Sequence, residues 1–181
     1  MTPRAARPPS VEELFDSLVS ELRDDRRLGG SLENEPDVER EVWRVVWKVC
    51  GFWFSDEKLP GIVLSSHESL QLPGRSAAKW EEFLFEKLAD LEVLGAKKRL
   101  DLVVRHPGGA TIGIEVECLS GASPADQLIV GLGQVLLARA HRDPVLLVAH
   151  CGRASAHAPQ VREIAGRVAA RIPRFAIVIR P

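Results

Sequence analysis

The stretch RLDLVVRHPGGATIGIEVEC, residues 99–118, decides the fold of this chain. Its central PGG triplet (107–109) is typical of a chain reversal, and the runs on either side are rich in Val, Ile and Leu. The pattern therefore predicts a β-hairpin, in which Asp101 lies roughly opposite Glu115. Glu115 and Glu117 share a face, because side chains alternate along a strand. We expect the three carboxylates to converge on one patch of the sheet.

Three carboxylates that lie together need a positive charge between them. Like charges raise each other's pKa and destabilise the fold unless a cation offsets them. Hard oxygen ligands favour Mg²⁺ or Mn²⁺ over zinc, so Asp101, Glu115 and Glu117 are the predicted metal ligands. The alternative is that these acids lie on a solvated strand. A fully exposed strand is disfavoured by the apolar residues of the second run, which are Ile112, Ile114, Val116 and Leu119.

Length and composition fit one globular domain with an appendage. The chain has 181 residues, of which 45% are hydrophobic and 27% charged. No apolar run approaches the ~20 residues that span a bilayer, and the first residues lack the apolar stretch of a secretory signal. Three cysteines without C-x-x-C spacing indicate reduced, mostly buried thiols rather than disulfides or a zinc site; they are Cys50, Cys118 and Cys151. These features predict a cytoplasmic protein with no membrane partner.

Charge is distributed unevenly along the chain. Residues 1–95 hold 12 Lys and Arg against 19 Asp and Glu, whereas residues 96–181 hold 12 against 6. Three of those six acids belong to the hairpin, where a cation would largely neutralise them. The C-terminal half would then present a basic field suited to a polyanion, unless its arginines only fill solvated helix faces. Lys97, Lys98 and Arg99 are the candidate phosphate contacts.

The elements after residue 75 follow a regular order. A helix is expected over 76–94, followed by the hairpin, a helix from 124 to about 141, a strand at 145–149, a helix at 159–172 and a strand at 175–179. The order is α-β-β-α-β-α-β. By the logic of packed layers it predicts an α/β protein whose mixed sheet is flanked by helices, in a domain covering residues 76–181.

Residues 1–75 are expected to form a helical extension. Helices are predicted at 11–26 and 38–54, with a short strand at 62–65. The second helix is apolar over more than half of its circumference, which is wider than the stripe of a typical surface helix. It either lies in the core or presents Trp43 and Trp47 to a partner, most simply a second copy of the chain.

With its acids, this order resembles the PD-(D/E)XK nuclease superfamily, which has the restriction-endonuclease-like fold. The resemblance covers residues 76–151 and extends to the C-terminus. KWEEFLFE (79–86) is similar to the helix that often carries a Glu, and RLDLV (99–103) to the first acidic strand. IEVE (114–117) is similar to the signature strand, and GLGQVLLA (131–138) to the helix that often carries a Gln.

The resemblance implies a metal-dependent nuclease that hydrolyses phosphodiester bonds in DNA, which is expected over RNA. By the same resemblance, Asp101 and Glu115 bind Mg²⁺ or Mn²⁺. Glu81, or less readily Glu82, assists through the metal or a water molecule, and Gln134 supports the active site.

Glu117 stands where the family has a Lys that orients the attacking water and stabilises the developing negative charge. Glu117 could instead act as a general base or as a ligand of a second metal. Alternatively, the role of the Lys has moved to Lys79, Lys97 or Lys98. A third alternative is an inactive site, in a protein that serves as a nucleic-acid-binding or assembly subunit. The last alternative is that the protein is an α/β scaffold without a site, in which these acids are solvated.

Overall fold

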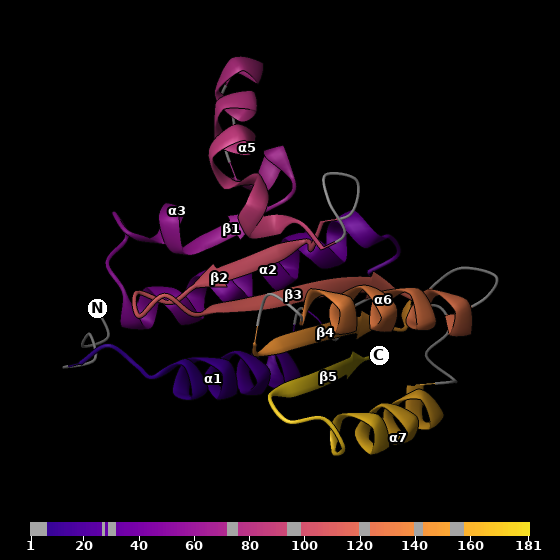
Figure 1. The fold of residues 1–181 in the computed structure, drawn as a ribbon. Helices are drawn as coiled ribbons and strands as arrows, with labels where there is room; N and C mark the ends of the chain where they lie inside the picture. The colour runs from indigo at the N-terminus through magenta and orange to yellow at the C-terminus, as the bar shows by residue number, and fades with distance from the viewer. Residues whose placement is uncertain are drawn as a thin grey trace.

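A computed structural model of the chain describes residues 7–26, 28, 32–71, 76–93, 99–119, 124–139, 143–152 and 158–181. These residues form a five-stranded mixed sheet with helices on both faces (Figure 1), which confirms the predicted α/β class. The elements are α1 (Val11–Asp24), α2 (Glu35–Trp53), α3 (Leu59–Ile62), β1 (Val63–Ser65), α4 (Glu68–Gln71), α5 (Ala77–Leu91), β2 (Leu102–Arg105), β3 (Thr111–Cys118), α6 (Pro124–Ala138), β4 (Val145–His150), α7 (Ala158–Ala169) and β5 (Phe175–Arg180).

The strands lie in the sheet in their order along the chain, from β1 to β5. The pairs β1–β2 and β2–β3 are antiparallel, whereas β3–β4 and β4–β5 are parallel and are connected through α6 and α7. The predicted hairpin is the β2–β3 pair, in which Leu102 lies opposite Ile114. Gly109 has a φ of 91° at the turn, a conformation that glycine adopts without strain. The hairpin and its predicted register are therefore confirmed.

Helices cover both faces of the sheet, so its central strands are apolar along almost their whole length. On one face, side chains such as Val104 and Ile114 pack against α1 and α2. On the other, side chains such as Val103 and Leu147 pack against α6 and α7. Every residue of β4 is buried. The acids of β3 thus lie in a strand that is otherwise part of two apolar cores.

Residues before 76 belong to the same packed layers. Helix α1 begins with a capping box, in which Ser10 and Glu13 each accept a hydrogen bond from the other's backbone amide. Both α1 and α2 pack on one face of the sheet, and β1 forms its edge. Trp43 and Trp47 stack with their rings 4.8 Å apart and are partly buried against this layer. The predicted extension therefore supplies a helical layer and an edge strand.

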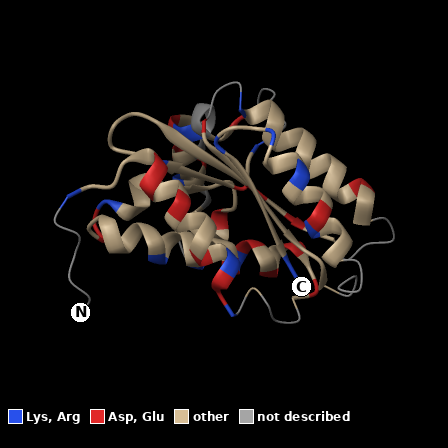
Figure 2. Cartoon of the chain, turned by 90° about the horizontal axis from the view of Figure 1, so that it is seen from below, with Lys and Arg blue, Asp and Glu red and all other residues tan. Residues whose placement is uncertain are grey.

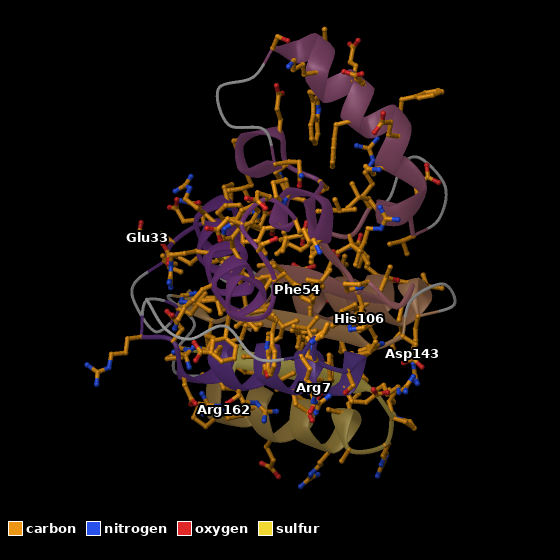
Figure 3. All side chains as sticks on the ribbon, turned by 90° about the vertical axis from the view of Figure 1, so that its left-hand side faces the viewer. Arg7, Glu33, Phe54, His106, Asp143 and Arg162 are labelled. Carbon is orange, nitrogen blue, oxygen red and sulfur yellow. The ribbon has the colours of Figure 1, made fainter. Side chains whose placement is uncertain are left out.

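Helix α5 meets these layers through Leu91, which is buried in the core on the α6 side, and through Phe83, which packs against that core. Figures 1 and 3 show most of α5 beyond the β1 edge of the sheet, and its Phe85 is 91% exposed. Within the described ranges, no helix is long and apolar enough to cross a membrane. The three cysteines are free and buried, as predicted.

Candidate metal centre

Asp101 and Glu115 face each other at one end of the β2–β3 hairpin. They are the next positions outward from the paired residues Leu102 and Ile114. Asp101 reaches across to β3, where its Oδ2 accepts a hydrogen bond of 2.8 Å from the backbone amide of Val116. This bond fixes one oxygen of Asp101 against β3, whereas the other, Oδ1, faces His67.

Glu115 is a buried acid with only one of its oxygens satisfied. Its side chain lies on the α6 face of the sheet, where Gln134 Nε2 donates a hydrogen bond to Oε1. Oε2 is buried and has no hydrogen-bond partner among the residues that the structure describes. Burial, and then the charges of Asp101 and Glu117, raise the pKa of Glu115 to about 9. Without a cation, this carboxyl therefore holds a proton at neutral pH.

Glu117 is also buried and lies directly beneath α6. A Cβ atom placed on Gly131 would come within 2.5 Å of Glu117 Cγ and 2.9 Å of its Oε1. Glycine at 131 is thus what allows the helix to approach this side chain. Gly131 and Gln134 are one turn apart on α6, and Glu115 and Glu117 are two residues apart on β3. The two elements therefore dock two acids against one face of one helix.

Two further side chains meet Asp101 from the opposite direction. His67 Nε2 lies 2.9 Å from Glu39 Oε2 and 3.6 Å from Asp101 Oδ1. One potential ligand atom from each of the three residues lies within 4.8 Å of the others. The carboxylates of Asp101 and Glu39 raise the pKa of His67 to about 10. Burial raises the pKa of Asp101, although His67 and the Val116 amide act in the opposite direction.

Hydrogen bonds of the neighbouring backbone hold His67 beside Asp101. The side chain of Ser65, at the end of β1, accepts a bond of 3.0 Å from the backbone amide of His67. The next residue, Ser66, donates its backbone amide to the carbonyl oxygen of Asp101 at 2.9 Å. Because Ser65 also pairs with Leu102, the segment after β1 is tied to the residue before β2. The imidazole position is therefore set by the sheet edge itself.

Glu39 and His67 were not among the predicted site residues. Glu39 had a visible signal, since it stands among the apolar positions of α2 that face the core, and it is 4% exposed. An acid on the apolar face of a helix needs a partner, which here is His67. His67 itself lies in a short segment after an edge strand, and no periodic pattern marks it.

The other residues predicted for the site lie on α5 or in the segment before β2. Glu81, Glu82 and Lys79 are exposed on α5, and the helical acid that does meet Asp101 is Glu39 of α2. Arg99 forms an isolated β-bridge with Glu92. Its Nε atom is buried and has no hydrogen-bond partner in the described part of the chain. Lys97 and Lys98 lie outside the described residues.

No family model, no curated protein and no solved structure matches this chain. The chemistry of the centre therefore has to be inferred from its own residues. These offer carboxylate oxygens from two adjacent strands and a helix, one imidazole nitrogen, and a buried acceptor with no partner among the described residues. Such a donor set suits a divalent cation.

Proposed function

We propose that the protein is a metal-dependent nuclease that hydrolyses phosphodiester bonds in DNA, with Asp101 and Glu115 as ligands of a divalent cation. The buried carboxyl of Glu115 carries this proposal. It has an oxygen without a partner among the described residues, a pKa raised to about 9 and two acids as neighbours. A cation would bind this oxygen and offset the negative charges. A divalent metal bound there would supply Lewis-acid polarisation of the phosphate and would activate a water molecule.

The surrounding chain would orient these ligands. The amide of Val116 holds one oxygen of Asp101, and Gln134 holds one oxygen of Glu115. Asp101 Oδ1, which faces His67, and Glu115 Oε2 would then be the oxygens that bind the cation. Fixed partners of this kind commonly raise metal affinity, because the ligands lose little freedom on binding. We assign to Gln134 this positioning role.

Glu117 is the residue that we assign to removal of a proton from the attacking water. It lies two positions along β3 from Glu115, and the backbone of Gly131 packs against it. A carboxylate can act as a general base where it lies within reach of the water that it deprotonates. The alternative role, as ligand of a second metal, would use the same carboxylate.

The order of elements also supports a nuclease-like centre. A helix that bears a buried acid precedes three antiparallel strands, and two parallel crossovers follow. The resemblance assigns an assisting role to a helical Glu, and we transfer this role from Glu81 to Glu39. Glu39 is buried beside Asp101, whereas Glu81 is exposed.

Binding of DNA would depend on arginines and lysines near the centre. Arg99 lies two residues before Asp101 and is the nearest described basic residue along the chain. Figure 2 shows Lys and Arg interspersed with Asp and Glu on the helices of both layers. Phosphate contacts would therefore come from single basic side chains beside the acidic centre, in the manner of backbone-positioning contacts.

The test is cleavage of supercoiled plasmid and of single-stranded DNA, with Mg²⁺ or Mn²⁺, by the parent and by Asp101→Asn and Glu115→Gln. We expect each substitution to reduce cleavage by on the order of 100-fold or more, since each removes a ligand charge. Glu163→Gln is the matched control, because Glu163 is exposed and pairs with Arg167 one turn away on α7. Equal cleavage by the parent and Asp101→Asn would overturn the proposal.

A second candidate is a non-catalytic subunit that binds nucleic acid or another chain. It is favoured by Glu117 at the position where the resemblance expects Lys. Calorimetry separates the two candidates: retained DNA binding without uptake of Mg²⁺ or Mn²⁺ at millimolar concentration would support the subunit.

A further inference from the structure

We propose that Glu39, His67 and Asp101 form a metal site of their own, in which the imidazole nitrogen of His67 is a direct ligand and selects a first-row transition metal such as Mn²⁺ over Mg²⁺. The site shares Asp101 with the Glu115 side of the centre. This inference rests on the proposed function only in placing the ion in a hydrolytic centre, because metal binding can be measured without DNA.

The spacing of the three ligand atoms suits a single ion. Metal–ligand bonds of about 2.1 Å place neighbouring ligand atoms about 3 Å apart and opposite ones about 4.2 Å apart in an octahedral site. His67 Nε2 is already 2.9 Å from Glu39 Oε2 and 3.6 Å from Asp101 Oδ1, and no pair exceeds 4.8 Å. The imidazole would therefore stand between two carboxylates after shifts of a few tenths of an ångström.

The surroundings hold more acid than one imidazolium can offset. Glu115 is 3% exposed, lies opposite Asp101 across the hairpin, and its Oε2 has no hydrogen-bond partner among the described residues. Glu115 is not a member of the triad, so this oxygen is an observation independent of the contacts within it. It indicates that the region is built for a charge greater than that of one proton.

The nitrogen ligand determines which metal is favoured. Mg²⁺ prefers oxygen ligands and retains its water, whereas affinity for a site with imidazole rises along the first transition series. If His67 only bridges the two acids as an imidazolium ion, no bond from nitrogen to metal forms. The two possibilities therefore differ in one measurable bond.

Electron paramagnetic resonance of Mn²⁺ bound to the full chain tests this bond. Pulsed spectra of the parent are expected to contain modulation from a directly bonded ¹⁴N, which becomes that of ¹⁵N when the protein carries ¹⁵N-histidine. The labelling experiment requires no substitution, so it remains decisive if a variant does not fold. Bound Mn²⁺ without nitrogen modulation, or no bound Mn²⁺ at millimolar concentration, would overturn the inference.

Substitution then assigns the nitrogen to His67. His67→Gln is expected to remove the modulation and to weaken Mn²⁺ binding by roughly 10- to 100-fold, with a change below about 3-fold for Mg²⁺. His106→Gln is the matched control, because His106 lies at the turn of the hairpin and contacts the carbonyl oxygen of Pro9. Unchanged modulation and Mn²⁺ affinity in His67→Gln would also overturn the inference.

Failure of this inference is distinguishable from failure of the proposed function. If Mn²⁺ is bound through nitrogen but the protein cleaves no DNA, the metal site is supported and the nuclease activity is contradicted. If DNA cleavage depends on Asp101 but Mn²⁺ is bound through oxygen alone, the nuclease activity is supported and the ligand role of His67 is contradicted.

Discussion

The raised pKa of Glu115 predicts that the metal-free protein loses stability as pH rises. The carboxyl has a pKa of about 9 in the folded protein and an ordinary value of 4.5. A carboxyl whose pKa is raised in the folded protein contributes to the free energy of unfolding. This contribution is fully present below pH 4.5 and is lost as the pH rises through 9. Each pH unit within this range removes up to about 1.4 kcal/mol. Between pH 5 and pH 8 the loss is at most about 4 kcal/mol, a large part of the ~5–15 kcal/mol that stabilises a typical domain.

Glu115→Gln isolates this contribution. The amide oxygen can still accept the hydrogen bond from Gln134, but the side chain no longer titrates. His67 also has a raised pKa and makes stability fall with pH, so the informative quantity is the difference between parent and variant. We expect Glu115→Gln to gain up to about 4 kcal/mol over the parent between pH 5 and pH 8.

Urea unfolding in the presence of a chelator, followed by tryptophan fluorescence at pH 5, 6.5 and 8, measures this difference. The exposed Glu163→Gln variant is the control, and its free energy of unfolding should run parallel to that of the parent. Parallel curves for the parent and Glu115→Gln would refute the reasoning, because they would show that Glu115 titrates alike in the folded and unfolded chains.

Three further results follow from the same contacts. Gly131→Ala should lower the free energy of unfolding by about 1–3 kcal/mol, because its Cβ meets Glu117 Cγ at 2.5 Å. Gly133→Ala on the same helix should raise it by up to about 1 kcal/mol, since no described residue lies within 4 Å of that Cβ, and chemical denaturation of both variants checks this. Millimolar Mn²⁺ should raise the melting temperature of the parent and leave that of Asp101→Asn unchanged, and equal shifts in scanning calorimetry would contradict the assigned ligand. Without metal, at pH 7, His67→Gln should destabilise the fold by roughly 1–3 kcal/mol, because a buried acid loses its partner, and a urea midpoint equal to that of the parent would exclude this.

The hairpin was predictable because its information is local. A turn triplet and alternating side chains fix the register, so the sequence alone indicated that Asp101 and Glu115 lie opposite each other. The role of Gln134 was expected only from the resemblance; in the structure Gln134 bonds Glu115, and Gly131 of the same helix lies against Glu117.

The other half of the centre depends on long-range packing. Which surface of the sheet an amphipathic helix covers is not encoded in its own pattern, so Glu81 was assigned to the centre although α5 stands beyond the β1 edge (Figure 1). Glu39 reaches Asp101 only because α2 packs against the sheet, and His67 because the segment after β1 is bonded to Asp101. An acid on the apolar face of α2 signals that Glu39 needs a partner, but the sequence does not indicate which residue that partner is, because these contacts join residues far apart in the chain.

The most direct test of the central claim is anomalous scattering from a crystal of the full chain grown or soaked with Mn²⁺. We predict a peak within about 2.2 Å of a carboxylate oxygen of Asp101 and of a carboxylate oxygen of Glu115. Clear density for both side chains, with no anomalous peak between them at saturating Mn²⁺, would contradict it.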